Sequence, residues 1–308
     1  MRKNAKFLEK NEKKFKKPLD ILQKGVYNVY IKQKDPGNTG RKRKKMKKLV
    51  SLTLAVLMVI GSLGMLASCG GNEDTITVYT EAGFAPYEFI YNGEVVGVDI
   101  AIMQAVANKL GKKLIVTDVA FDTICTSVQG GKADAGAAGI TIRPDRAEMV
   151  DFSIPYSSTE QYIIVKTDNT TINTLEDLVG KNIGIQQGTT SDMLIDDLIK
   201  DGTLAGSSII PYTSPAVAAA SMNKQDAVVT DKLTAQLIVA NDSSLKAFAL
   251  KKADGTPAAE VEEYGICVKK GNAELLATIN EVLTELLANG TIDQWIAEYS
   301  EKAKEVGA

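Results

Sequence analysis

The chain has 308 residues, and its 36 Lys and Arg against 38 Asp and Glu give a formal net charge of −2. It contains no histidine, which excludes Ser-His-Asp and Cys-His catalysis, His-ligated zinc and a histidine-based pH switch near neutrality. Residues 1–48 hold 18 basic and 4 acidic side chains, so the rest holds 18 basic against 34 acidic ones, a net charge of −16, and this argues against a nucleic acid as partner because neutralising phosphates requires a basic face.

Residues 46–68 have the three parts of a bacterial export signal. Met46 and two lysines are followed by a charge-free apolar run over 49–67 and by small residues before Cys69, the order of n-region, h-region and cleavage site. The letters LASC that end at Cys69 resemble a lipobox, so we expect this cysteine to carry a lipid after cleavage. The alternative is a membrane-spanning helix, for which the run is barely long enough and which its two glycines weaken.

Residues 1–45 precede this signal, although a signal peptide normally begins its chain. Their last letters, GRKRKK, are basic and have no apolar period. We expect 1–45 to be a misassigned N-terminal extension, with Met46 as the true first residue. Residues 1–68 are therefore excluded from the fold, and residues 69–74, which read CGGNED, are interpreted as a tether.

The 3 cysteines have no CxxC spacing, so we expect no metal site, and nothing in the chain indicates a cofactor. With Cys69 assigned to the lipid, Cys125 and Cys267 are either two buried thiols or one disulfide bridge. Buried thiols are favoured because free cysteine packs as a small apolar side chain.

Strand and helix signals alternate in the first part of the exported body. Asp99 is placed to cap a helix that Gly111 ends, and Phe121-Asp122 is placed to cap a second helix. A βαβαβ unit of this kind predicts a mostly parallel sheet with helices on both faces. The expected strands span residues 75–80, 114–119 and 133–138, and the expected helices span residues 100–110 and 121–131.

The same alternation continues after Tyr156. Ser214-Pro215 has the N-cap residue and the first-position proline of a helix. The strand at 227–229 ends in Thr230-Asp231, and residues 263–266 resemble a return crossing. Other strands are expected at 161–166 and 183–186, and helices at 174–179, 191–200, 273–289 and around Trp295. The apolar stripe of the 273–289 helix and Trp295 are expected to lie in the core.

Two motifs identify a family resemblance. Residues 139–146 read GITIRPDR and residues 150–156 read VDFSIPY. This pattern resembles the extracellular solute-binding proteins of family 3, which deliver polar amino acids to ABC importers, and the resemblance runs from about 75 to 302. It implies a type II periplasmic-binding-protein-like α/β fold with two crossover strands. Lobe I would comprise residues 75–157 plus 265–308, and lobe II residues 158–264.

A free amino acid has one carboxylate and one ammonium, and each needs a partner once water is expelled. For the carboxylate the candidates are Arg146, whose planar fork can bind both oxygens, and Thr141. The loop of Gln187, Gly188, Thr189 and Thr190 opens a helix whose backbone N–H groups can bind an anion. The alternative for that loop is a plain N-cap.

Asp231 is the candidate for the ammonium, because open α/β sheets bind ligands at the carboxyl ends of their strands. It can equally be a helix N-cap, and Asp226 is interpreted as structural. The family resemblance favours Asp231, since the aspartate at this position of the family contacts the α-amino group.

The resemblance implies that Glu81 reads the ligand side chain, that Phe84 and Phe121 wall it, and that Gly139 contacts it. The alternative for each phenylalanine is a place in the core. Arg143 departs from the small polar residue usual in the family. It would favour an acidic ligand if it faced the cleft, whereas Glu81 favours a cationic or amide side chain.

Three functions are compatible with these observations. The first is a binding protein, not an enzyme, that closes around a polar amino acid and docks on an ABC permease as a monomer, lipid-anchored on the outer face of the cytoplasmic membrane or in the periplasmic space. The second is a cyclohexadienyl or arogenate dehydratase-like enzyme on the same scaffold, with Glu81 as its acid. The third is a sensory lobe of a signalling protein, which the lack of a later apolar run or kinase motif disfavours.

Overall fold

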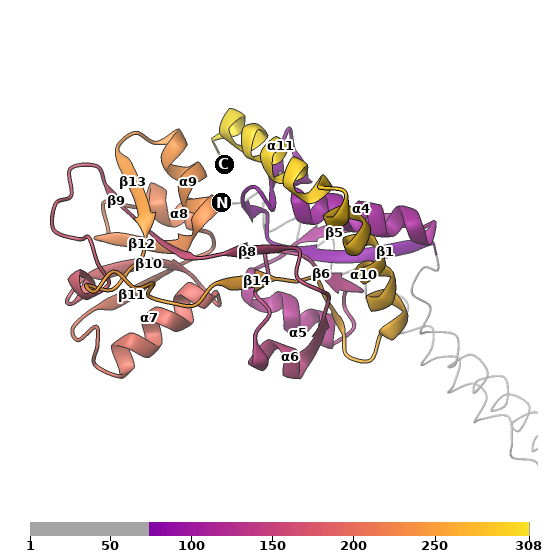
Figure 1. The fold of residues 1–308 in the computed structure, drawn as a ribbon, viewed down its shortest axis with the longest axis horizontal. Helices are drawn as coiled ribbons and strands as arrows, with labels where there is room; N and C mark the ends of the chain where they lie inside the picture. Colours follow the sequence, from indigo (N-terminus) through magenta and orange to yellow (C-terminus); the bar gives the residue numbers. More distant parts are fainter. Residues whose placement is uncertain (1–73, 308) are drawn as a thin grey trace, which may run out of the picture. The chain divides into compact units, whose positions relative to one another are not determined.

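The structure, a computed structural model, describes residues 74–307. The predictions for 1–45, for the signal at 46–68 and for Cys69 lie outside the described residues. Two five-stranded sheets, each flanked by helices, form the framework of the described part (Figure 1). We call the sheet that contains the first strand, with its helices, lobe I, and the other sheet with its helices lobe II.

Lobe I has the strand order β5-β1-β6-β15-β7. Strands β5, β1 and β6 are parallel, and β15 runs antiparallel to both β6 and β7. The sheet strands are β1 (Thr75–Thr80), β5 (Lys113–Asp118), β6 (Ala135–Gly136), β7 (Val150–Phe152) and β15 (Cys267–Lys269). A small sheet consists of β2 (Gly83–Phe84), β3 (Glu88–Tyr91) and β4 (Glu94–Val96). The helices are α4 (Val98–Leu110), η1 (Phe121–Thr123), α5 (Ile124–Gln129), α6 (Pro144–Met149), α10 (Ala273–Ala288) and α11 (Thr291–Val306).

Lobe II repeats this plan with the order β11-β10-β12-β9-β13. Strands β11, β10 and β12 are parallel, and β9 is antiparallel to β12 and β13. The strands are β9 (Gln161–Lys166), β10 (Asn182–Gln186), β11 (Ser208–Tyr212), β12 (Ala227–Asp231) and β13 (Leu245–Ala249). The helices are η2 (Glu176–Leu178), α7 (Thr190–Lys200), α8 (Pro215–Ala220) and α9 (Lys232–Asn241).

Two paired strands connect the lobes. Strand β8 (Ser157–Thr159) leaves lobe I and strand β14 (Glu262–Tyr264) returns to it, and they run antiparallel side by side between the two sheets (Figure 1). The predicted two-lobed α/β fold with two crossover strands is therefore confirmed.

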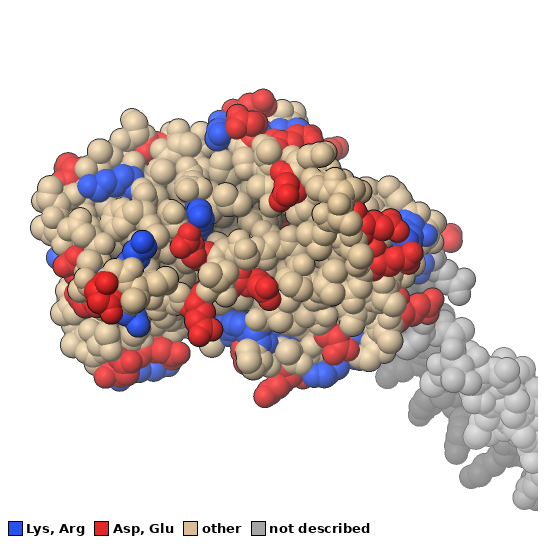
Figure 2. Space-filling view, in the orientation of Figure 1, with Lys and Arg blue, Asp and Glu red and all other residues tan. Residues whose placement is uncertain are grey.

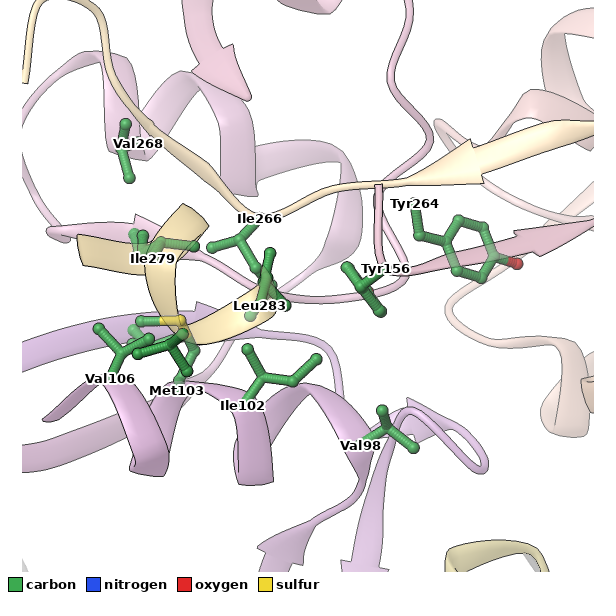
Figure 3. Close-up of a cluster of buried hydrophobic side chains, with 14 of the residues drawn as sticks. Val98, Ile102, Met103, Val106, Tyr156, Tyr264, Ile266, Val268, Ile279 and Leu283 are labelled. Carbon is green, nitrogen blue, oxygen red and sulfur yellow. The ribbon is translucent and has the colours of Figure 1, made fainter. Parts of the chain in front are cut away.

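The core of lobe I lies between α4, α10 and the sheet. Buried side chains of α4 such as Ile102 and Met103 pack against Ile279 and Leu283 of α10 (Figure 3). These positions recur at helical spacing on both helices, so each helix turns one apolar stripe inward. Trp295 packs half-buried against the same cluster, as the sequence predicted.

Asp99 does not cap helix α4, and this prediction is wrong. The helix begins at Val98 after Gly97, and Asp99 lies fully buried in its first turn. A Cβ at Gly97, whose φ is +137°, would lie 2.0 Å from the carbonyl oxygen of Tyr87, so the entry to the helix requires glycine. Asp99 instead accepts hydrogen bonds from the Gly139 N–H at 2.9 Å and the Tyr156 hydroxyl at 2.8 Å.

The helix predicted at 174–179 is also wrong in extent. A single 3₁₀ turn, η2, occupies this place. The side chain of Asp177 accepts hydrogen bonds from the backbone N–H groups of Asn173 and Thr174, and Leu175 and Leu178 are buried. The few hydrogen bonds of so short a segment do not compensate for the entropy lost in nucleating an α-helix. A turn stabilised by the Asp177 carboxylate forms instead.

The two cysteines among the described residues are thiols. Cys125 and Cys267 are both free and buried in lobe I, in agreement with the alternative that the sequence favoured.

Lys and Arg side chains on the face shown in Figure 2 form small separate groups among acidic ones. Within residues 74–307, the helices include none with the length and apolarity that a membrane span requires.

Candidate functional site

The two sheets direct the carboxyl ends of their parallel strands toward one cavity between the lobes. In open α/β sheets this edge is where loops and helix starts present polar groups to a ligand. Thirteen residues line a space of about 370 Å³, of which about 20 Å³ can hold the centres of water molecules. They are Phe84, Phe121, Ala138, Gly139, Thr141, Arg146, Gln186, Thr189, Thr190, Ser191, Val229, Thr230 and Asp231. Eight of the ten residues predicted to bind ligand are among them, and Glu81 and Gln187 are not.

Arg146 projects from α6 of lobe I and is 6% exposed. Its guanidinium donates to the carbonyl oxygen of Thr141 at 2.9 Å and, across the cavity, to that of Gly188 at 3.1 Å. The guanidinium carbon also lies 5.3 Å from the ring centre of Phe121, in cation–π range. Burial lowers the pKa of Arg146, and the nearby positive charge of Arg143 lowers it further.

The guanidinium of Arg146 retains unused binding capacity. No carboxylate within residues 74–307 lies within ion-pair distance of it. An arginine has five N–H donors, and two of them serve the carbonyls, which leaves three for an added anion. A buried cation normally has an anionic partner, because desolvating a lone charge is costly.

The loop before α7 faces Arg146 from lobe II. Thr189 is the N-cap and its hydroxyl accepts from the Asp192 N–H at 3.2 Å, while the Asp192 carboxylate accepts from the Gly188 N–H at 2.8 Å. The alternative of a plain N-cap is therefore true for Thr189. Thr189, Thr190 and Ser191 nevertheless line the cavity at the positive end of the α7 dipole.

Asp231 ends β12 on the side of the cavity that belongs to lobe II, and it is 8% exposed. It occupies the N-cap position of α9, but its side chain does not cap the helix. Its carboxylate instead accepts hydrogen bonds from the Gln161 amide at 2.8 Å and from the Tyr264 hydroxyl. Burial raises the pKa of Asp231 to about 7, and the neighbouring Glu262 carboxylate adds to the rise.

A carboxylate has about four lone-pair positions. Because Gln161 and Tyr264 use two of those on Asp231, two remain for a cation. The cavity thus combines Arg146 of lobe I, which has no carboxylate partner among residues 74–307, with Asp231 of lobe II, whose carboxylate has two free lone-pair positions.

Glu81 does not line the cavity, but it is hydrogen-bonded to Gln186, which does. Its carboxylate accepts from the Gln186 amide across the lobes at 2.8 Å. Burial raises the pKa of Glu81 to about 7; the hydrogen bond from Gln186 opposes the rise and the nearby Asp118 adds to it. Gln187 is exposed and its amide donates to Asp122 at 3.3 Å. Side chains alternate along a strand, so Gln186 faces the cavity and its neighbour Gln187 does not.

The two predicted aromatic walls line the same cavity. Phe84 is buried and Phe121 half-buried. Phe84 also packs on Gly139, where an added Cβ would lie 2.9 Å from its ring and where φ is +52°. Glycine at 139 therefore permits both the backbone turn and the close approach of Phe84.

Arg143 does not line this cavity. Its guanidinium forms two hydrogen bonds to the Asp145 carboxylate, at 2.9 and 2.7 Å, and the side chain borders a separate open groove at the surface. The positive charge of Arg143 is thus paired with Asp145 and does not face the cavity, where it was expected to favour an acidic ligand.

Sequence reasoning missed the polar groups that hold the predicted residues in place. Gln161, Ser191, Tyr264 and Glu262 have no motif of their own, and Gln186 was one position from a residue that was named. The period of two along β10 was the available signal for Gln186, since Ile183 and Ile185 pack into the core cluster of lobe II and Gln186 comes from the opposite face.

Comparisons with known proteins agree with this geometry. A family model described as bacterial extracellular solute-binding proteins, family 3, matches residues 76–302. The "ABC transporter arginine-binding protein 1" of Escherichia coli (strain K12) is 30% identical over 232 residues, which cover 73% of this chain and 92% of that protein.

Solved structures show the same fold. A structure described as an ancestral arginine-binding protein bound to arginine is 38% identical to this chain and has a TM-score of 0.66. The match covers 73% of this chain and 98% of the ancestral protein. A second, described as the ancestral amino acid-binding protein AncCDT-1, a precursor of cyclohexadienyl dehydratase, is 31% identical with a TM-score of 0.64, and covers 73% and 95%. The chain therefore belongs to the bacterial extracellular solute-binding proteins of family 3.

Proposed function

We propose that this protein captures a polar L-amino acid in the cavity between its lobes and presents it to an ABC permease. The lobes, which we take as residues 75–157 plus 265–308 and residues 158–264, close about β8 and β14. Closure requires contacts that are better made in the closed arrangement than in the open one. An amino acid bound at one end by each lobe meets this requirement.

One observation carries the proposal. Arg146 of lobe I is a buried cation without a carboxylate partner among residues 74–307, and it lines the same cavity as Asp231 of lobe II. We assign the α-carboxylate to Arg146, Thr141 and the start of α7, and the α-ammonium to Asp231. Gly139, Phe84 and Phe121 would enclose the ligand between them.

We further propose that the ligand side chain is cationic, as in L-arginine. With Arg146 assigned to the α-carboxylate and Asp231 to the α-ammonium, Glu81 is an acidic group that remains beside the cavity, where it accepts from Gln186 of the wall. A cationic ligand side chain would therefore have an acidic partner in Glu81. The relatives named as arginine-binding support this choice.

Calorimetry with purified protein tests both statements. We expect L-arginine to bind more tightly than L-glutamine, and L-glutamate to bind weakly. Agmatine lacks the carboxylate and argininic acid lacks the α-amine, so each should lose most of the affinity if both charged ends are held. Absence of binding by every polar L-amino acid would reject the proposal.

Membrane attachment is a separate part of the proposal. We propose that Cys69 becomes the lipid-modified first residue after cleavage, and that the monomer is held on the outer face of the cytoplasmic membrane or in the periplasmic space. The signal at 46–68 and the family's extracellular role support it. Labelling of cells with a fatty-acid analogue should mark the wild type and leave Cys69→Ser unlabelled.

A dehydratase-like activity is the second candidate, and one observation favours it. Glu81 is a carboxyl group whose pKa burial raises to about 7, which suits a general acid. Incubation with prephenate or arogenate tests it. Turnover that Glu81→Gln abolishes would establish the enzyme, whereas equal rates with and without the wild type would exclude it.

A further inference from the structure

Glu262 has an unusual position at the centre of the described structure. It is the first residue of β14, the strand that returns from lobe II to lobe I. One of its carboxylate oxygens accepts from the Thr141 hydroxyl at 2.7 Å. The other accepts from the Gln161 amide at 2.7 Å. A single carboxylate on a crossover strand thus receives one hydrogen bond from each lobe.

These two donors are themselves parts of the site. The backbone carbonyl of Thr141 accepts from Arg146 at 2.9 Å. The amide nitrogen of Gln161 donates its second hydrogen to Asp231 at 2.8 Å. Glu262 therefore lies one hydrogen-bonding residue away from both the cation and the anion that are proposed to hold the ligand.

The orientation of Gln161 is fully determined by its neighbours. Its amide oxygen accepts from the Ser191 hydroxyl at 2.6 Å, so its NH₂ group must face the two carboxylates of Asp231 and Glu262. A carboxylate cannot donate, which means that a reversed amide would set oxygen against oxygen at both positions. Glu262 thereby directs a donor hydrogen toward Asp231.

We propose that Glu262 is a positioning residue for ligand capture: it couples the two lobes by accepting from Thr141 and Gln161, and it orients the Gln161 amide so that this amide donates to Asp231. This inference rests on the proposed function of the cavity and adds to it a residue that does not touch the ligand. A carboxylate that accepts from one donor of each lobe links the two lobes at the strand about which they are proposed to close.

The electrostatics of Asp231 provide a readout that a purely structural role would not move. The charged and titratable groups facing Asp231 are Glu262 and Tyr264 on β14, Arg146 on α6, and Tyr87. Glu262 raises the pKa of Asp231 by repulsion, whereas Tyr264 and Arg146 lower it. Removing the charge of Glu262 while keeping its shape should lower the pH at which Asp231 titrates.

Glu262→Gln is the test variant and Glu263→Gln the matched control. Glu263 is the next residue of the same strand, its side chain is exposed, and its backbone carbonyl, which accepts from the Ile142 N–H, is unchanged in the variant. We expect Glu262→Gln to weaken L-arginine binding by about 10- to 100-fold, the usual effect of losing a hydrogen bond to a charged group. We expect the control to bind within about threefold of the wild type.

Two measurements complete the test: calorimetry between pH 5 and 9, and carbon NMR of the Asp231 carboxyl in the protein without amino acid. We expect the Asp231 midpoint in Glu262→Gln to lie below that of the wild type and of Glu263→Gln. Equal midpoints and equal affinities in all three proteins would overturn the inference. If the wild type binds no amino acid but the Asp231 midpoint still shifts, the proposed function fails while the coupling from Glu262 to Asp231 stands. A thermal unfolding midpoint close to that of the wild type verifies that each variant is folded.

Discussion

Arg146→Met separates a binding role of Arg146 from a structural one. Methionine is unbranched and apolar, so it can fill the space beside Phe121 without a charge. In the wild type the guanidinium is 6% exposed and donates only to two carbonyls, at 2.9 and 3.1 Å, among residues 74–307. Its burial without a counter-ion costs several kcal/mol, and the two charge-assisted hydrogen bonds, which contribute about 1.5–3 kcal/mol each, offset part of that cost.

We therefore expect opposite effects on binding and stability. Leaving a ligand carboxylate unpaired in a desolvated site costs about 2–5 kcal/mol, which weakens affinity roughly 30-fold to several thousandfold. The unfolding midpoint without ligand should stay equal or rise, because an uncompensated charge is removed. Calorimetry and differential scanning calorimetry measure the two quantities. Arg143→Met, which removes a cation already paired with Asp145, should bind nearly as the wild type does.

Two results would refute this reasoning. If Arg146→Met bound L-arginine as tightly as the wild type, the carboxylate would be held elsewhere. If instead the variant unfolded many degrees earlier, Arg146 would be a structural residue whose carbonyl contacts outweigh its burial.

Three further predictions concern single side chains. Asp231→Asn should weaken amino-acid binding at least 30-fold, yet it should raise the unfolding midpoint at pH 8 in the absence of ligand. The pKa of Asp231 is about 7 in the folded protein and lies above the ordinary 3.8. The stability that the protonated Asp231 contributes below pH 4 in the wild type is therefore lost as the pH rises through 7. Glu88 is fully buried beside Asp99, and burial together with the charge of Asp99 raises its pKa well above the usual range. Urea midpoints should therefore fall as the pH rises above the ordinary glutamate range, more steeply in the wild type than in Glu88→Gln, and parallel slopes would contradict this. Phe121→Leu should weaken affinity by about 2- to 5-fold through loss of the stacking on Arg146, and an unchanged dissociation constant in calorimetry would count against that contact.

Most of the fold could be predicted because its signals are local. Ser214 accepts from the Val217 N–H and Pro215 is the first residue of α8, as the cap pattern predicted. The stripe that includes Ile279 and Leu283 is buried. These features depend on a few neighbouring residues, so periodicity and capping rules suffice.

Predictions failed where a distant partner decided the outcome. Asp99 has the type and place of an N-cap, but Gly139 and Tyr156, which are 40 and 57 residues away, donate to its side chain. Glu262 and Gln161 carry no motif, and their role depends on two crossover strands that place them side by side. A single sequence contains no rule for such pairings. The resemblance to a family could name Arg146 and Asp231, yet not the network between them.

The division of charge between the lobes determines which part of binding can drive closure. In the proposed arrangement an α-carboxylate can reach Arg146 on lobe I while the lobes are apart, and that contact alone shifts no equilibrium because it is equally good in both arrangements. The contacts of the carboxylate with the start of α7 and of the ammonium with Asp231 are added only when lobe II arrives, so their free energy favours the closed form. Glu262 joins this second step, because the Gln161 amide that it holds also donates to Asp231. The free energy of closure would therefore come from both ends of the ligand, from the ammonium through Asp231 and its partner Gln161 and from the carboxylate through the start of α7.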